Sequence, residues 1–209
     1  MNRNKPAVYI VDDDQDFRES LTVLVVMLGY QVYAFSSAEA FLECTQIRRP
    51  ACLLLDVFLP NIDGFQVQKR LQERGMLMPV IFITGHGDVP MGVKAMKDGA
   101  VDFLLKPFDK KDLHRAIVLA HDRDADLVRK EELRKNVSFR IALLTPRERE
   151  VMLQVVTGKL NKQIASTLGI AEKTVRIHRS SLMRKLEVFS VAALIKMLAD
   201  TDAGHFSSD

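Results

Sequence analysis

Five side chains that could do chemistry lie at the ends of short apolar runs, far apart in the sequence. They are Asp12, Asp13, Asp56, Thr84 and Lys106. Three carboxylates in one place repel one another, so a hard divalent cation with oxygen ligands is their natural counter-charge, and Mg²⁺ fits that description. A hydroxyl and an ammonium group beside them would hydrogen-bond and charge-pair with a phosphoryl group. The residue types therefore predict metal-assisted phosphoryl chemistry.

The first half of the chain alternates between strand and helix patterns, and this alternation predicts how the five residues meet. Short strands separated by single helices pair in parallel through right-handed crossovers, with helices on both faces of the sheet. The carboxyl ends of such strands share one edge, where ligands bind. Apolar runs and helical spacing predict strands over 7–11, 31–35, 52–56, 80–84 and 101–105, and helices over 16–28, 38–46, 64–74, 91–97 and from 109 onward.

The acidic run at 12–16 also has a plainer interpretation. Carboxylates stabilise a helix N-terminus, and we expect Asp14 and Asp16 to do so for the helix that follows. Taken alone, the whole run would fit that role. Its combination with Asp56 and Lys106 favours the phosphoryl pocket.

The charge of the chain is unevenly distributed along its 209 residues. The net charge is +3, but residues 1–124 hold 15 Lys and Arg against 17 Asp and Glu, a balance of −2. Residues 140–196 hold 11 Lys and Arg against 4 Asp and Glu, a balance of +7. A weakly acidic first half and a basic second half indicate two domains, of which the basic one is expected to meet phosphate.

Composition excludes several classes of protein. With 47% hydrophobic and 27% charged residues, the chain is neither collagen-like nor wholly disordered. Residues 1–10 lack a signal-peptide pattern, and the longest apolar stretch, 21–30, is about half of the roughly 20 residues that a membrane span needs. Cys44 and Cys52 form neither a disulfide framework nor a metal motif. We expect a cytoplasmic protein with no membrane partner.

The second half predicts a charged linker followed by a helix-turn-helix. Residues 121–137 are dense in charge and lack Gly and Pro, which favours a solvated extension of the preceding helix, with a coiled coil as the alternative. The run 145–148, Thr-Pro-Arg-Glu, has the pattern of a capping box that opens a helix. A second helix is expected over 162–168, capped by Asn161, and a longer basic helix over 172–186.

The basic helix has two different faces. Val175, His178, Leu182 and Leu186 lie on the face that should pack against the earlier helices. The opposite face could enter a major groove of DNA, although a merely solvated charged face is the alternative. We expect base contacts from Lys173, Arg176, Ile177, Ser180 and Arg184, and phosphate contacts from Lys162, Thr174, Arg179 and Lys185.

Short motifs at the ends of the predicted strands follow one another in residues 5–123. They are Val11-Asp12-Asp13, Leu55-Asp56, Leu59-Pro60, Asp63-Gly64, Thr84-Gly85 and Lys106-Pro107-Phe108. Through these motifs, residues 5–123 resemble the receiver domains of two-component response regulators. The resemblance implies a flavodoxin-like (βα)5 fold, an α/β domain with a parallel five-stranded sheet, in which Asp56 accepts a phosphoryl group from a phosphohistidine of a sensor histidine kinase.

The same resemblance implies how the pocket is divided among its residues. Asp13, Asp56 and the backbone carbonyl of Phe58 would hold Mg²⁺, and Asp12 would position the ion through water. Lys106 would pair with the bound phosphoryl group.

A conformational switch is also implied. Thr84 would move towards the phosphoryl group and leave space for Phe103 to turn inward, so that a local event selects one of two surface arrangements. Two phosphorylated receivers are then expected to pair through residues 91–105.

Two further positions are predicted to influence the lifetime of the phosphorylated form. Phe58 lies two residues after Asp56, and His86 lies two residues after Thr84. An apolar ring at Phe58 would keep a hydrolytic water away, so we expect a long-lived acyl phosphate. His86 either influences hydrolysis or is a plain loop residue.

Residues 143–198 resemble the LuxR-type (FixJ-like) helix-turn-helix domain. This implies an all-α domain of four helices, with a fourth helix over 191–198 through which DNA-bound domains pair. Two departures stand out: Ala171 replaces the usual hydroxyl cap, at a cost of about 1 kcal/mol, and Glu187 stands where Gly is common. The matching segments are 144–150, 161–165, 168–170, 173–179 and 183–186, with Gly158.

These features predict a response regulator that is phosphorylated on Asp56, dimerises and binds promoter DNA to regulate transcription. Its expected partners are a sensor histidine kinase, double-stranded DNA and a second copy of the chain, with RNA polymerase as a further candidate. We expect no enzyme activity beyond transient aspartyl-phosphate chemistry and slow autodephosphorylation. The expected domains are a receiver over 1–123, a helical linker over 124–140, a helix-turn-helix domain over 141–200 and a disordered tail over 201–209.

Two other functions remain as alternatives. One is a Mg²⁺-dependent phosphatase with an aspartyl nucleophile, but such enzymes usually carry a second acid two residues after the nucleophile, where Phe58 stands. The other is a DNA-binding protein that does not depend on phosphorylation, against which the intact acidic pocket argues.

Overall fold

The computed structural model describes residues 5–200 and divides into two compact units. The N-terminal unit extends to Val128, and the C-terminal unit begins at Arg129. The predicted tail at 201–209 lies outside the described residues. Within residues 5–200, no helix is long and apolar enough to cross a membrane.

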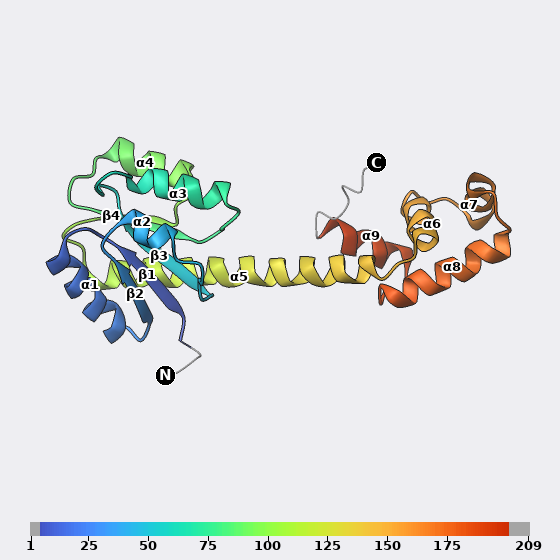
Figure 1. Cartoon of the computed structure of the whole chain (residues 1–209), viewed down its shortest axis with the longest axis horizontal. Helices are drawn as coiled ribbons and strands as arrows, with labels where there is room; N and C mark the ends of the chain where they lie inside the picture. Colours follow the sequence, from blue (N-terminus) through green and yellow to red (C-terminus); the bar gives the residue numbers. More distant parts are fainter. Residues whose placement is uncertain (1–4, 201–209) are drawn as a thin grey trace. The chain divides into compact units, whose positions relative to one another are not determined.

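The N-terminal unit is built on a parallel five-stranded sheet, as predicted. Its strand order is β2-β1-β3-β4-β5, which is the flavodoxin-like order (Figure 1). The pairing register aligns Val11 of β1 with Leu55 of β3, so the carboxyl ends of these neighbouring strands lie side by side. The strands are β1 (Ala7–Val11), β2 (Gln31–Phe35), β3 (Ala51–Asp56), β4 (Val80–Thr84) and β5 (Asp102–Leu105).

Five helices follow the strands and cover both faces of the sheet (Figure 1). The sheet has an apolar core on each face, and alternate residues of β3 point into one or the other. Leu53 and Leu55 pack with α2, α3 and α4, whereas Leu54 packs with α1 and α5. Such strands are buried on both faces, which explains their continuous apolar runs. The helices are α1 (Gln15–Met27), α2 (Ala38–Leu42), α3 (Gly64–Glu73), α4 (Val89–Lys97) and α5 (Lys110–Ala142).

Two helix boundaries differ from the sequence prediction by two residues or more. The helix predicted over 38–46 ends at Leu42, because the chain must return towards β3, where the Tyr9 hydroxyl accepts a hydrogen bond from the Arg48 backbone N–H at 2.8 Å. The helix predicted to start at Met91 starts two residues earlier, because the Asp88 side chain caps it by accepting a hydrogen bond from the Met91 backbone N–H at 2.8 Å.

Helix α5 is one helix of 33 residues, and the predicted linker at 124–140 lies within it. Asp124 is fully buried and accepts hydrogen bonds from the Ala51 backbone N–H at 2.7 Å and from Arg49 Nε at 3.1 Å. The helix therefore remains anchored to the sheet at this point. Further along, Val137 and Ile141 belong to the core of the C-terminal unit.

The C-terminal unit packs four helices and the end of α5 around one apolar core. They are α6 (Pro146–Val156), α7 (Asn161–Leu168), α8 (Glu172–Lys185) and α9 (Val191–Ala199). The capping box predicted from Thr145 and Glu148 is present. The prediction that Asn161 caps α7 is wrong: the N-cap is Leu160, whose backbone N–H donates to Gln163 Oε1 at 2.8 Å.

Candidate functional site

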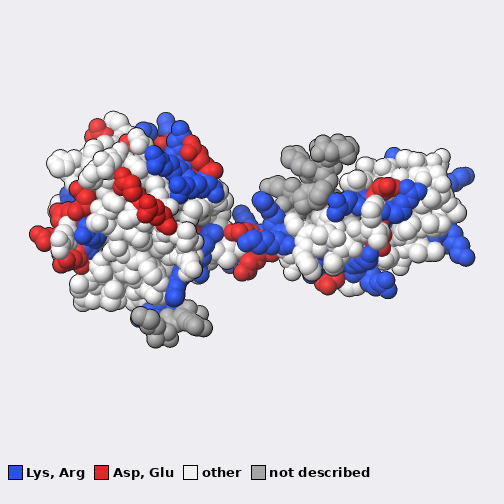
Figure 2. Space-filling view, in the orientation of Figure 1, with Lys and Arg blue, Asp and Glu red and all other residues white. Residues whose placement is uncertain are grey.

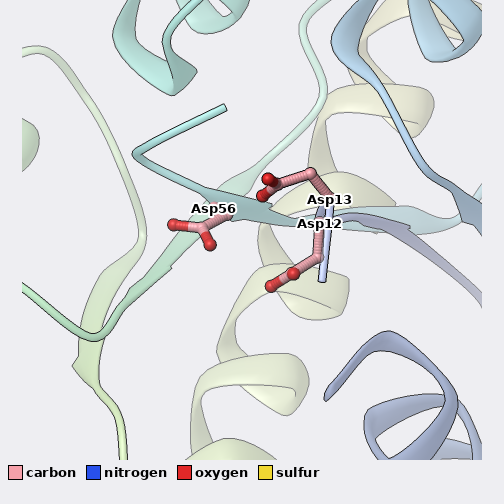
Figure 3. A group of neighbouring side chains, drawn as sticks. All are labelled: Asp12, Asp13 and Asp56. Carbon is pink, nitrogen blue, oxygen red and sulfur yellow. The ribbon is translucent and has the colours of Figure 1, made fainter. Parts of the chain in front are cut away.

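Three carboxylates gather where β1 and β3 end. Asp12 and Asp13 follow β1, and Asp56 is the last residue of β3. One oxygen from each side chain lies within 4.8 Å of the others, and Figure 3 shows the three side chains together at the ends of the two strands. The sheet therefore brings together residues that are more than forty positions apart in the sequence.

Asp12 is held in a nearly buried position. Its Oδ1 accepts a hydrogen bond from the Asp14 backbone N–H at 3.0 Å, and its backbone carbonyl accepts one from Arg18 Nη1 at 2.7 Å. Burial raises the pKa of Asp12, and the hydrogen bond and charge of Lys106 offset only part of that rise. A buried carboxylate of this kind is stabilised by additional positive charge in the pocket.

Lys106 connects two of the three carboxylates. Its Nζ lies 2.8 Å from Asp12 Oδ2 and 3.1 Å from Asp56 Oδ2. Burial acts to lower the pKa of Lys106, but the hydrogen bonds and charges of the two carboxylates outweigh it and raise that pKa. The pocket therefore carries a fixed ammonium group beside the carboxylate of Asp56.

Three acidic side chains with this spacing fit a hard divalent cation. Mg²⁺ prefers oxygen ligands and usually binds through one or two carboxylates while it keeps several waters. Asp12 and Asp56 are buried and Asp13 is exposed, so two carboxylates of the cluster are shielded from solvent and the third is accessible to it. The donor chemistry suits Mg²⁺; the ligand role of the Phe58 backbone carbonyl stays a prediction.

Thr84 and Phe103 occupy the neighbouring strands β4 and β5. Thr84 is fully buried, and its Oγ1 accepts a hydrogen bond from the His86 backbone N–H at 3.2 Å. Phe103 is half-buried beside Gly87, where an added Cβ would lie 2.9 Å from its ring. The Phe103 ring also lines an open surface pocket with residues of α4, including Val89 and Met96. The predicted switch residue thus lies beneath the surface formed by α4 and β5.

The two positions predicted to influence phosphoryl lifetime contact each other. The rings of Phe58 and His86 are arranged edge to face, with centroids 6.3 Å apart. Phe58 is 51% exposed, and its backbone N–H donates to Asp56 Oδ1 at 3.1 Å. The ring of His86 is therefore part of the same surface as Phe58, and its influence on hydrolysis stays a prediction.

Helix α8 presents the two faces that the sequence predicted. Val175, Leu182 and Leu186 are buried in the core of the C-terminal unit, and His178 is half-buried. In Figure 2, Lys and Arg outnumber Asp and Glu on the visible face of this unit. Five of the predicted base-contacting residues are exposed on the other face of α8, namely Lys173, Arg176, Ile177, Ser180 and Arg184.

The predicted phosphate-contacting residues differ in their surroundings. Lys162 is exposed and Thr174 is half-buried. Arg179 Nη1 donates to Asn161 Oδ1 at 3.0 Å. Lys185 is more tightly engaged: its Nζ donates to Glu148 Oε2 at 2.6 Å and to the Leu143 carbonyl at 3.1 Å. The geometry therefore gives Lys185 a structural role in addition to its predicted one.

Glu148 connects α6 to α8, a role that the sequence analysis did not recognise. Its carboxylate accepts hydrogen bonds from Ser181 Oγ and Lys185 Nζ, both at 2.6 Å, and from the Thr145 backbone N–H at 2.8 Å. Burial alone would raise the pKa of Glu148, but the hydrogen bonds from Lys185, Ser181 and Thr145 lower it to about 2. The capping-box pattern was the available signal, but it shows only the contact with Thr145.

The two departures from the LuxR pattern have visible structural consequences. Ala171 is the N-cap of α8 and makes no side-chain cap hydrogen bond. Glu187 adopts a left-handed backbone conformation, with φ of 55°, just after α8 ends. Glycine adopts this conformation without steric cost, which explains why Gly is common there. Glu187 also pairs with Arg140 at 2.7 Å.

Known proteins resemble the chain over both units. The response regulator receiver domain family matches residues 8–118, and the luxR family of bacterial regulatory proteins matches residues 142–198. The chain is 45% identical over 193 residues to nodulation protein W of Bradyrhizobium diazoefficiens, covering 92% of this chain and 85% of that protein. It is 43% identical over 190 residues to the transcriptional regulatory protein FixJ of Azorhizobium caulinodans, covering 91% and 90%.

A solved structure of a known response regulator has the same fold over both units. The response regulator StyR matches with a TM-score of 0.80 and 40% sequence identity, covering 93% of this chain and 98% of that one. The matches therefore span the sheet with its acidic pocket as well as the helices with the basic α8. The chain belongs to the two-component response regulators that join a receiver domain to a LuxR-type DNA-binding domain.

Proposed function

We propose that Asp56 accepts a phosphoryl group from a phosphohistidine of a sensor histidine kinase, and that the phosphorylated chain dimerises and regulates transcription at promoter DNA. The observation that carries this proposal is the Lys106 ammonium group, which lies within hydrogen-bonding distance of both Asp12 and Asp56 inside a carboxylate cluster. The proposed kinase partner and promoter DNA support a cytoplasmic location for this chemistry. RNA polymerase is a further candidate partner.

The chain's own residues divide the transfer among them. A carboxylate oxygen of Asp56 forms a bond to phosphorus while the phosphorus–nitrogen bond of the phosphohistidine breaks, and the imidazole leaves with that electron pair and takes up a proton. Mg²⁺ bound by Asp13 and Asp56, with Asp12 acting through water, would supply positive charge opposite the phosphoryl oxygens. Lys106 is already positioned to pair with the product.

The switch from pocket to surface is proposed to pass through Thr84 and Phe103. Thr84 ends β4 fully buried, and Phe103 lies on the adjacent strand beside Gly87 and Gly92. If Thr84 moves towards the phosphoryl group, the Phe103 ring can turn inward and change the surface of α4 and β5. This surface, residues 91–105, is the proposed contact between two receivers.

A phosphatase acting on external substrates is the less favoured function. The position two residues after Asp56 holds Phe58, whose half-exposed ring cannot act as a general acid. We therefore propose that the chain catalyses only its own phosphorylation and a slow autodephosphorylation.

Asp56→Asn tests the proposal. The variant is expected to take up no phosphoryl group from acetyl phosphate with Mg²⁺, as measured by mass spectrometry, and to show no phosphodonor-dependent gain in DNA binding. Glu43→Gln, which removes a carboxylate outside the pocket, is the matched control and should behave like the wild type. Phosphorylation of Asp56→Asn would show that the nucleophile is wrong. Equal DNA binding by the wild type with and without phosphodonor would favour the phosphorylation-independent alternative.

A further inference from the structure

An aromatic ring from α1 contacts the ammonium group of the pocket. Lys106 Nζ lies 3.8 Å from the centroid of the Phe17 ring, well within the distance of a cation–π interaction. Phe17 is half-buried and contributes neither an oxygen ligand nor a phosphoryl contact to the pocket. The ring of Phe108 packs against the ring of Phe17 in an edge-to-face arrangement, with the two centroids 6.2 Å apart.

The hydrogen-bonding capacity of the ammonium group explains why a ring is useful here. An ammonium group carries three N–H donors. Two of them are used by Asp12 and Asp56, and the Lys106 side chain is only 20% exposed. The electron-rich face of Phe17 lies 3.8 Å from Nζ and adds a third interaction to the two carboxylate contacts of the ammonium group. The ring therefore stabilises the charged form without competing for the two carboxylates.

The contact with Phe17 differs from the other two when the pocket is in use. Both carboxylate partners of Lys106 are expected to interact with Mg²⁺, Asp56 as a ligand and Asp12 through water, and Asp56 loses a free oxygen when it is phosphorylated. Among the side-chain contacts of Lys106 within residues 5–200, the ring is the one that neither event alters. A fixed ring can hold the ammonium group at the pocket while its carboxylate partners change.

The position of the ring is itself fixed by the acidic turn. The Asp14 side chain caps α1 by accepting a hydrogen bond from the Phe17 backbone N–H at 3.1 Å. Asp14 directly follows Asp12 and Asp13, so the turn that places the carboxylates also places Phe17. The ring packs in addition against the apolar core beneath α1 and α5.

We propose that Phe17 is a positioning residue for phosphoryl transfer, which holds the Lys106 ammonium group beside Asp56 through a cation–π contact. This inference rests on the proposed function, because it assumes that Asp56 is phosphorylated. It adds a group from α1 to a pocket otherwise built from strand ends.

Progressive fluorination of the Phe17 ring tests the proposal. Mono-, di- and trifluorinated phenylalanine at position 17 keep the shape of the ring but withdraw electron density from its face. The rate of phosphorylation by acetyl phosphate at saturating Mg²⁺ is expected to fall stepwise, by about fivefold at the end of the series, which corresponds to about 1 kcal/mol. The phosphorylation rate of Phe17→Leu is expected to be lower by a similar factor, and Phe17→Trp is expected to retain the wild-type rate.

The same fluorinated series at Phe108 is the matched control. Phe108 belongs to the same aromatic pair, but within residues 5–200 the cation–π contact of the ammonium group is with Phe17, so the Phe108 series should show no graded change in rate. Thermal unfolding of every variant checks that the fold is retained. A flat series at Phe17, or equal slopes at the two positions, would overturn the inference. If Asp56→Asn still blocks phosphorylation in that case, the proposed function stands without it.

Discussion

At the scale of single residues, two aromatic side chains adjoin the pocket without offering an oxygen ligand or a phosphoryl acceptor. Phe58 lies two residues after Asp56, and its half-exposed ring contacts His86. Phe17, on α1, contacts the Lys106 ammonium group with the face of its ring. Both are apolar rings next to a highly polar site, where we expect them to limit the access of water and to strengthen the remaining charge interactions.

Replacing Phe58 should change the lifetime of the phosphorylated form. Phe58→Asn is expected to shorten the half-life of the acyl phosphate roughly tenfold, equal to about 1.4 kcal/mol in the barrier, because an amide can orient the attacking water that the ring excludes. The measurement is the decay of phosphorylated protein after the phosphodonor is removed. Phe58→Leu keeps an apolar side chain and should decay at the wild-type rate. An unchanged decay rate in Phe58→Asn would contradict the shielding role.

At the scale of elements, α8 divides its residues between core and solvent at helical spacing. Val175, Leu182 and Leu186 pack into the core. The Glu148 carboxylate accepts hydrogen bonds from Ser181 and Lys185 in the last turns of the helix. A helix anchored by both apolar packing and a buried carboxylate presents its exposed face in one fixed orientation. Fixed orientation is what base recognition in a groove requires.

Arg176 is the residue with which to test that face. Its side chain is 73% exposed, and its Nη2 lies 3.7 Å from Glu172 Oε1. Arg176→Ala is expected to weaken binding to the specific promoter site by about 1–3 kcal/mol and to affect random duplex much less. Lys130→Ala on α5 removes the same charge away from α8 and serves as the control. Titrations at several salt concentrations separate the base contribution from the phosphate contribution to binding. Equal losses of affinity on specific and random DNA would show that Arg176 contacts phosphate and does not read a base.

At the scale of the whole molecule, two units with separate cores share one chain through α5. The N-terminal unit has two apolar layers around its sheet, and the C-terminal unit has one core of its own. All three tyrosines, Tyr9, Tyr30 and Tyr33, lie in the N-terminal unit. Near-ultraviolet signals of tyrosine therefore report on that unit alone, whereas far-ultraviolet circular dichroism reports on both.

Glu148 should make the C-terminal unit sensitive to acid. Its pKa is about 2 in the folded chain against an ordinary 4.5, so the stabilisation is complete above pH 4.5 and is lost as the pH falls towards 2. Between pH 7 and pH 3 the free energy of unfolding of this unit is expected to fall by about 2 kcal/mol from this group. Urea unfolding at pH 7 and pH 3 should show the far-ultraviolet transition shifting more than the tyrosine transition.

Glu148→Gln and Glu150→Gln form a matched pair for this measurement. Glu148→Gln should destabilise the C-terminal unit at pH 7 and remove most of its additional acid sensitivity. Glu150 lies on the same helix but is exposed, with its side chain 48% accessible, so Glu150→Gln should leave both transitions near their wild-type values. Identical acid shifts in the two variants would show that Glu148 is not the source.

The sequence by itself determined the order of the elements, the residues at the strand ends and the two faces of α8. These follow from local spacing: apolar runs predict strands, the 3.6-residue period predicts helices, and parallel pairing then brings the strand ends together. The acidic pocket could be predicted in this way because its residues are strand-end residues.

Only the tertiary structure decided which side chains touch. Lys106 meets Asp12 across 94 positions, and Lys185 meets Glu148 across 37. The contact of Phe17 with Lys106, the pairing of Phe58 with His86 and the early end of α2 are of the same kind. Such contacts depend on how side chains pack between elements, and no local period encodes that. The chemistry of the pocket was therefore visible in the sequence, whereas the contacts of Phe17 with Lys106 and of His86 with Phe58 were not.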